Sequence, residues 1–347
     1  MRILNVMLGR SLGGLEQALL DYDVALTQCG HEVHTVIHPD SALRPALKAK
    51  KANLHNLPHA GAWDPLAATR LRRLLRQLRV DISIAHGNRA VSLLRFAGAA
   101  PIAAVMANYK IKCGSLAAAF CPTMDLRRHA IDQGLPVSCA YHVPYMVDVP
   151  PEPGRQAWRT PPIIGAMGRM VAKKGFDVFI DALARLQSNG TVLRAILAGD
   201  GPERGALERL AVQRGLSDVL SFPGWITDKQ TFFAGIDVFC LPSHHEPFGI
   251  VLIEAMAHAL PIVTTDSEGP AEILHDGVDG MIVPRGDIAQ LAEALGTLIA
   301  ERDRAETLAA NAYRHVLASY DVPRVGMRLD LAVREIVERA GRLEATG

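Results

Sequence analysis

The chain has 347 residues, 49% of them hydrophobic and 21% charged, which supplies enough apolar material for buried cores and favours about two domains. Lys and Arg number 37 and Asp and Glu 36, so the net charge of +1 indicates no nucleic-acid, membrane or acidic partner. This balance hides a division. Residues 1–150 hold 17 basic and 10 acidic side chains, whereas residues 151–347 hold 20 and 26. The two halves therefore carry opposite charge.

Neither a membrane span nor a secretory signal is expected. The longest apolar run, residues 96–107, has 12 residues, whereas a bilayer-spanning helix needs about 20. The first eight residues lack the small-residue cleavage site of a signal peptide. The five cysteines include no Cys-x-x-Cys pair, so we expect reduced thiols in a cytoplasmic protein rather than a zinc or redox site.

Strands and helices alternate in the first half of the chain. Short β-branched or apolar runs predict strands at residues 2–8, 32–37, 80–85 and 102–106, of the kind that parallel sheets bury on both faces. Apolar residues at helical spacing predict a helix over residues 15–29, which Gly30 ends. This alternation favours a doubly wound, Rossmann-like α/β domain over residues 1–150.

A proline-rich connector separates this domain from a second one. Residues 149–162 contain five prolines in 14 positions, a composition that resists helix and sheet, and we place a linker at residues 151–162. The alternation then restarts, which predicts a second Rossmann-like domain over residues 163–322. Its strands are expected at residues 163–167, 193–198, 219–222, 236–241 and 261–265. Pro323 is expected to end the last helix. Residues 323–347 would then form a separate closing helix, and packing on the first domain is one arrangement open to it.

Ligands of open α/β sheets bind beyond the carboxyl ends of the strands, so the residues that follow each strand are the informative ones. Gly13 and Gly14 follow the first strand and open a helix, where missing side chains let an anion approach the backbone. A tight turn without a ligand explains them equally well. Gly199, in a glycine turn after another strand, is likewise a weak signal on its own.

The loop after residues 163–167 is a stronger candidate. Arg169 and Lys174 lie on it between Gly168 and Gly175. A guanidinium clamps phosphate oxygens through its planar fork, and an ammonium acts as a movable charge. One basic loop residue is usually solvated surface, but two between glycines at a strand end favour an anion site.

Two glutamates in Glu-x7-Glu spacing mark the most distinctive segment. Glu246 follows the strand at residues 236–241, and Glu254 lies in the next helix among apolar neighbours. Burying a carboxylate is costly unless it accepts hydrogen bonds, which ligand hydroxyls would supply. The alternative, two solvent-facing glutamates, requires a polar helix face that this segment lacks.

Several ordered motifs resemble the group 1, family 4 retaining glycosyltransferases of the GT-B fold, in which two Rossmann-like domains face each other across a cleft. The resemblance is strong over residues 160–290 and weaker before them. Its carriers are the Glu246/Glu254 pair in HEPFGIVLIEAMAHALPIV, Gly-Arg-x4-Lys-Gly at residues 168–175, LAGDGPE at 197–203 and EGPAEILHDGVDGMIV at 268–283. In the first half, Gly13, Gly14 and His86 are the anchors.

The resemblance implies a nucleotide-diphosphate sugar donor, held mainly by the second domain. Arg169 and Lys174 would bind the diphosphate, and Glu254 the ribose hydroxyls. Glu246 would contact the donor sugar together with the backbone of Phe248, Gly249 and Ile250. The turn at Trp225 and Ile226 would border the base, Gly199 would line the site, and Gly13 and Gly14 would approach the phosphates. His86 would contact the transferred sugar, with Ile84 in the place of the family's other histidine.

The implied reaction is transfer with retained anomeric configuration to a saccharide or glycolipid acceptor, as in lipopolysaccharide or envelope polysaccharide synthesis. Because Arg169 and Lys174 supply the cations that a departing diphosphate needs, no metal or other cofactor is expected. A GT-B phosphorylase, a nucleotide-sugar epimerase and a nucleotide-sugar-binding pseudoenzyme are the alternatives. A dehydrogenase is disfavoured because the dinucleotide fingerprint is missing.

The basic first half offers a surface for an anionic partner. Residues 69–80 alternate arginines with leucines, which predicts an amphipathic basic helix. Such a helix docks on anionic membranes or phosphorylated lipids, so we expect a cytoplasmic protein that binds the inner membrane face peripherally. The alternative is an ordinary helix that packs its leucines on the sheet.

Overall fold

The structure is a computed structural model that describes residues 1–10, 13–61, 63–99, 101–152 and 157–346. Its contacts divide the chain into two compact units, residues 1–146 with 322–347 and residues 147–321. The sequence analysis placed the first domain at residues 1–150 and the linker at 151–162; residues 153–156 of that linker lie outside the described residues.

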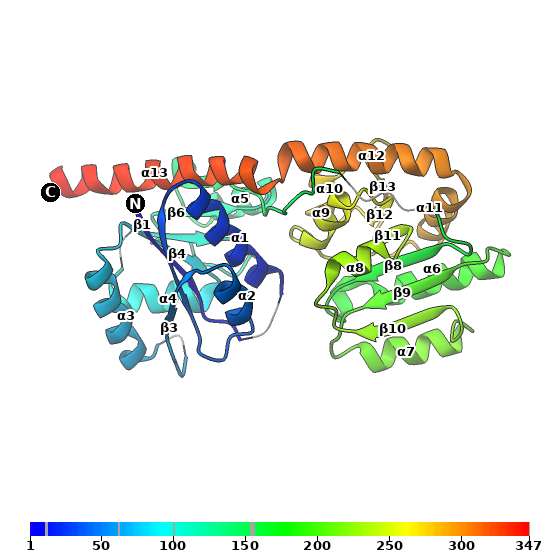
Figure 1. The fold of residues 1–347 in the computed structure, drawn as a ribbon, viewed down its shortest axis with the longest axis horizontal. Coiled ribbons are helices and arrows are strands. Elements are labelled where there is room, and N and C mark those ends of the chain that lie inside the picture. Colours follow the sequence, from blue (N-terminus) through cyan, green and yellow to red (C-terminus); the bar gives the residue numbers. More distant parts are fainter. Residues whose placement is uncertain (11–12, 62, 100, 153–156, 347) are drawn as a thin grey trace. The chain divides into compact units, whose positions relative to one another are not determined.

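The first unit is built on a seven-stranded parallel sheet in the order β3-β2-β1-β4-β5-β6-β7 (Figure 1). Its strands are β1 (Arg2–Met7), β2 (Glu32–Ile37), β3 (Asn53–Asn56), β4 (Ile82–His86), β5 (Ile102–Val105), β6 (Ala118–Cys121) and β7 (Ala140–His142). Its helices are α1 (Gly14–Gln28), α2 (Arg44–Ala49), α3 (Pro65–Leu78), α4 (Asn88–Ala97), α5 (Met124–Asp132) and α13 (Val322–Thr346). Every residue of β4, β5 and β6 is buried, as expected when helices cover both faces of a parallel sheet.

The second unit holds a six-stranded parallel sheet in the order β10-β9-β8-β11-β12-β13 (Figure 1). Its strands are β8 (Ile163–Met167), β9 (Arg194–Ala198), β10 (Leu220–Gly224), β11 (Val238–Leu241), β12 (Ile262–Thr265) and β13 (Met281–Val283). Its helices are α6 (Phe176–Ser188), α7 (Arg204–Gln213), α8 (Lys229–Ala234), α9 (Ile250–Ala257), α10 (Pro270–Ile273), α11 (Ile288–Ala300) and α12 (Arg302–Ser319). One apolar cluster joins this sheet to α6, α7 and α11.

Two parallel, doubly wound sheets with helices confirm the predicted fold class. The helical region is interrupted next to Pro323, as predicted: α12 ends at Ser319 and a separate closing helix, α13, begins at Val322, with Pro323 in its first turn, where a missing N–H costs nothing. The closing helix α13 belongs to the first unit, where Gly326 lies close to Ala25 of α1 and Asp330 pairs with His31 at 2.6 Å.

Candidate active site

The strand order of the second unit reverses between β8 and β11. These neighbouring strands are followed by connections that run to opposite sides, which makes the space beyond their carboxyl ends the usual ligand position in such sheets. The loop after β8 carries Arg169 and Lys174, and the loop after β11 carries Glu246. The topology therefore brings together the residues that the sequence analysis singled out.

Close backbone approaches fix these loops. Gly175 has φ +63°, and a Cβ built on it would lie 2.1 Å from the Pro242 carbonyl oxygen of the neighbouring loop. Gly199, after β9, has φ +127°, and its Cβ would lie 1.9 Å from the Gly168 carbonyl oxygen. Only glycine fits either position. The glycines that the sequence analysis assigned to an anion site thus also hold three neighbouring loops in register.

Lys174 and Glu246 form an ion pair at this edge. The Lys174 ammonium donates to Glu246 Oε2, and both side chains are largely buried. Glu246 is 8% exposed, which rules out the solvent-facing alternative for it. A buried pair of this kind keeps each charge in place, because the loss of either partner leaves the other charge uncompensated.

Arg169, on the same loop, is a cation without a partner among the described residues. Its side chain is exposed, and its guanidinium has neither a hydrogen bond nor an ion-pair partner in the part of the chain that the structure describes. Its planar fork is therefore available to an anion beside the Lys174–Glu246 pair.

Glu254 lies on α9 and is 8% exposed, so it too is not solvent-facing. Its Oε1 accepts from Lys229 Nζ at 2.5 Å, while its buried Oε2 has no hydrogen-bond partner among the described residues. Sequence reasoning missed Lys229; its only signal was a position at the start of α8, after a strand end. Ser243 Oγ, just after β11, is a second buried polar atom without a described partner. Unsatisfied buried polar atoms are rare and need an explanation, such as a ligand.

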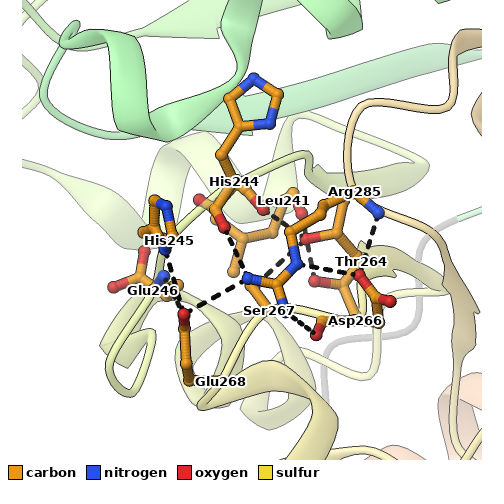
Figure 2. A network of polar contacts seen from close by, with 11 residues as sticks. Leu241, His244, His245, Glu246, Thr264, Asp266, Ser267, Glu268 and Arg285 are labelled. Atoms are coloured by element: carbon orange, nitrogen blue, oxygen red, sulfur yellow. Dashed lines mark hydrogen bonds and ion pairs between the residues drawn. The ribbon is translucent and has the colours of Figure 1, made fainter.

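A polar network supports the loop that carries Glu246 (Figure 2). The backbone N–H of Glu246 donates to Glu268 Oε2 at 3.1 Å, and His245 Nδ1 lies 3.0 Å from Glu268 Oε1. Arg285 binds Glu268, Asp266 and the carbonyl oxygen of His244. Burial alone would raise the pKa of Glu268, but its hydrogen bonds and the nearby Arg285 hold it at about 2. Glu268 is therefore an ionised anchor of the loop that carries Glu246. It opens the motif at residues 268–283, but no role was predicted for it.

The donor contacts predicted around Trp225 and Gly249 also lie at this edge of the second unit. Trp225 and Ile226 follow β10, and Trp225 is exposed. Gly249, with φ +94°, ends the Glu246 loop directly before Ile250 starts α9, and Phe248 is buried beneath them. Their contacts with a donor stay predictions.

His86 ends β4 in the first unit, where the strand order reverses between β1 and β4. It is 1% exposed: its Nε2 lies 2.6 Å from Asn5 Oδ1, and the ring of Tyr22 packs edge-on at 5.2 Å. Burial lowers the pKa of His86 to about 3, so the imidazole is neutral, and its Nδ1 has no described partner. Gly13 and Gly14 start α1 at the same end of the sheet. The predicted sugar contact of His86 is not tested by this geometry.

The basic helix is α3, and all of its leucines except the exposed Leu66 face inward. Asp64 caps it by accepting from the N–H groups of residues 66 and 67. Leu71 is buried, and Leu74, Leu75 and Leu78 pack against the same core. The alternative of an ordinary packed helix is therefore right for the leucines, while its arginines are exposed. Among the described residues, no helix has the length and apolar character needed to cross a membrane.

Two family profiles match the chain in the order of its units. The profile described as "Glycosyl transferases group 1" matches residues 152–315, and the profile "Glycosyl transferase 4-like domain" matches residues 13–118. The first range contains all of the charged residues of the second unit's edge, and the second contains Gly13, Gly14 and His86.

Curated relatives and solved structures agree with these profiles. The lipopolysaccharide core biosynthesis glycosyltransferase LpsE of Rhizobium meliloti is 30% identical over 89% of this chain and 92% of its own length. LpsD of the same organism is 27% identical over 86% and 88%. The crystal structure of Anabaena HepE with UDP and glucose superposes with a TM-score of 0.83 at 20% identity, covering 96% of this chain and 99% of HepE. The chain thus belongs to the group 1 glycosyltransferases of the GT-B fold.

Proposed function

We propose that the protein transfers a sugar from a nucleotide-diphosphate donor to a saccharide or glycolipid hydroxyl with retention of anomeric configuration and without a metal. The observation that carries this proposal is the cationic loop after β8, in which Lys174 is held by Glu246 and Arg169 is unpaired among the described residues. Charge develops on the diphosphate as the sugar–phosphate bond breaks. Preorganised cations at that point stabilise the transition state.

The remaining donor contacts follow from the same edge. The unpartnered Oε2 of Glu254 supports a role in accepting hydrogen bonds from ribose hydroxyls. Glu246, already bound to Lys174, would orient the donor sugar rather than attack it. Trp225 and Ile226 would border the base, and the N–H groups after Phe248 would face the sugar. On the first unit, Gly13 and Gly14 would approach the phosphates, and the unpartnered Nδ1 of His86 would serve the transferred sugar.

The relatives narrow the candidates. HepE binds UDP and glucose, and LpsE and LpsD act in lipopolysaccharide core biosynthesis. A UDP-hexose is therefore the first donor to test, with GDP-sugars next, and a lipopolysaccharide-type oligosaccharide is the first acceptor.

A thermal-shift panel of nucleotide-diphosphate sugars tests the donor, because a ligand that binds only the folded state raises Tm by mass action. Transfer by the identified donor is then measured in EDTA, and the anomeric configuration of the product is read by NMR. We expect one donor to raise Tm and transfer to continue in EDTA with retention. An inverted product, or activity that EDTA abolishes while Tm is unchanged, contradicts the mechanism; release of sugar phosphate in free phosphate would support the phosphorylase alternative.

We further propose that an anionic lipid surface, which would present the acceptor, docks on the first unit. Trp63 and Leu66, at the start of α3, are 70% and 71% exposed, and the ring of Trp63 packs against Phe96 with centroids 5.9 Å apart. Arg70 and Arg73 are exposed on the same helix. Exposed aromatic and aliphatic side chains beside arginines match the apolar–anionic boundary of such a membrane. These residues define the docking face.

Flotation with vesicles of anionic or neutral lipid tests the docking face. We expect binding to anionic vesicles at low salt, loss of binding at high salt, and loss in the double variant Arg70→Glu/Arg73→Glu. Arg209→Glu, an exposed charge reversal on α7 of the second unit, is the matched control. Binding that charge reversal of the docking face leaves unchanged would refute this surface.

A further inference from the structure

Two histidines and an aspartate meet in the second unit, away from the residues of the proposed donor site. His275 and Asp279 lie in the segment between α10 and β13, and His315 lies on α12. Asp279 Oδ2 is 3.1 Å from His275 Nδ1 and 2.8 Å from His315 Nδ1. One carboxylate oxygen therefore faces two imidazole nitrogens that come from separate elements.

The segment between α10 and β13 is itself well ordered by short-range bonds. A bridge joins Asp276 to Gly280, and Gly277 N donates to the Gly280 carbonyl at 2.8 Å. Asp279 is buried, and its Oδ1 accepts from the backbone N–H of His275 at 2.6 Å. The second oxygen of the carboxylate is thereby directed at the two rings. This is the arrangement in which an outer hydrogen bond orients a metal ligand.

The spacing fits a tetrahedral cation. Ligands at about 2.0–2.1 Å from Zn²⁺ stand roughly 3.3 Å from one another, close to the two separations measured here. Among the described residues, these three side chains are a set of possible metal ligands, and their ligand atoms all lie within 4.8 Å of one another. Two imidazoles with one carboxylate are a donor set that zinc accepts.

A cluster of the same residue types in the first unit lacks this convergent geometry. His34 Nδ1 lies 3.1 Å from His55 Nε2, and His34 Nε2 lies 3.0 Å from Glu32 Oε1. The central imidazole uses opposite ring nitrogens for its two neighbours, so no single ion can reach all three residues. The same residue types thus form a chain of hydrogen bonds in one unit and a convergent set in the other.

We propose that His275, Asp279 and His315 form a three-ligand Zn²⁺ site, with water as the fourth ligand. The His275 side chain is 64% exposed, which leaves the ion a path from solvent and room for that water. The site joins α12 to the segment before β13, so its role is to stabilise the second unit. It is independent of the proposed function, because none of its residues belongs to the proposed donor site.

Cobalt titration of the metal-free protein tests the site, since tetrahedral Co²⁺ absorbs visible light intensely enough to be distinguished from the octahedral aqueous ion. We expect one equivalent to bind with a tetrahedral spectrum and to be displaced by Zn²⁺. His275→Ala and Asp279→Asn should weaken binding by more than about 100-fold, beyond the cost of losing an outer-sphere partner alone. His55→Ala, which alters the chain-like cluster, is the matched control and should bind as the wild type does.

Thermal unfolding gives a second readout. Zn²⁺ should raise Tm of the wild type and of His55→Ala, but not of His275→Ala, whose exposed position keeps the fold intact. An octahedral spectrum, a wild type that binds no Co²⁺, or equal binding by His275→Ala would overturn the proposal. Circular dichroism of each variant separates a lost ligand from a lost fold.

Discussion

The two sheets place very different chemistry at corresponding points. In the second unit, the strands that flank the reversal of order are followed by Arg169 and by the paired charges of Lys174 and Glu246. In the first unit, the same place holds the neutral His86 bound to Asn5, and the glycines at the start of α1. The second unit's edge holds a buried ion pair, whereas the buried side chain at the first unit's edge is a neutral imidazole and the charges of Arg10 and Arg89 there are exposed.

This difference refines the division of charge along the chain. Part of the positive excess of residues 1–150 lies on the exposed arginines of α3, and part follows the switch-point strands, where Arg10 comes after β1 and Arg89 after β4. The acidic second half, in contrast, concentrates its functional cations on one loop. The net charge of each half therefore does not predict where a ligand site lies, whereas the residues that follow the switch-point strands do.

The two edges also differ in how tightly their backbone is packed. Replacing a glycine at each edge tests this difference and is expected to give the largest effect. Gly175→Ala would place a Cβ against the Pro242 carbonyl at positive φ, and we expect a loss of more than about 4 kcal/mol in the free energy of unfolding. The backbone at Gly13 is extended, with φ −173°, and a Cβ there would meet only the end of the Glu16 side chain. Gly13→Ala should therefore cost less than about 1 kcal/mol. Denaturant unfolding of both variants measures the two values; similar losses would break the comparison.

The charge at the second unit's edge is tested by Lys174→Ala. Removing the ammonium leaves Glu246 with a buried, uncompensated charge and takes one cation from the diphosphate site, so kcat/KM should fall by about 10²–10³. Lys173→Ala removes an exposed ammonium from the neighbouring position and should leave kcat/KM within about twofold. Steady-state kinetics with the identified donor decide it. Equal losses in both variants would mean that only total loop charge matters.

Much of this edge was predictable because local signals and topology coincide there. The strand-end positions of Arg169, Lys174 and Glu246, and the switch-point rule, are enough to bring the three together. The strands β3, β6, β7 and β13 were missed, since β3 is only half buried and β6, with its alanines, lacks a β-branched pattern.

Tertiary partners were not predictable. Lys229 reaches Glu254 from a helix 25 positions away, and Arg285 reaches Glu268 from beyond β13. No spacing rule links such residues, because their proximity depends on the order of strands in the sheet. The inward direction of the α3 leucines was likewise open, since an amphipathic pattern does not tell a core from a membrane.

Glu254→Gln sharpens the assignment of the ribose contact. The amide keeps an acceptor for Lys229 but turns the unpartnered side of the carboxylate into a donor or a weaker acceptor, so donor affinity should fall by about tenfold, or 1.4 kcal/mol. Glu208→Gln, on α7 and paired with Arg204, is the control and should bind the donor as the wild type does. Calorimetric Kd values for the donor's nucleoside diphosphate provide the measurement. Unchanged affinity in Glu254→Gln would remove Glu254 from the ribose site.

The buried imidazole at the first unit's edge makes the smallest prediction, a pH dependence of stability. With a pKa of about 3 in the folded state and an ordinary value near 6.5 when unfolded, His86 binds its proton only in the unfolded chain between these values. Its contribution to stability is therefore complete above pH 6.5 and lost as pH falls toward 3, with a loss of about 1 kcal/mol already at pH 5.8.

The variant His86→Gln tests this dependence, because it keeps a donor for Asn5 but does not titrate. The difference in unfolding free energy between the wild type and His86→Gln should shrink by that amount from pH 7.5 to 5.8. Because other histidines titrate in both proteins, the difference isolates His86. A difference that stays constant over this range would mean that the imidazole is accessible to protons when folded, and that the two edges are less distinct than their burial indicates.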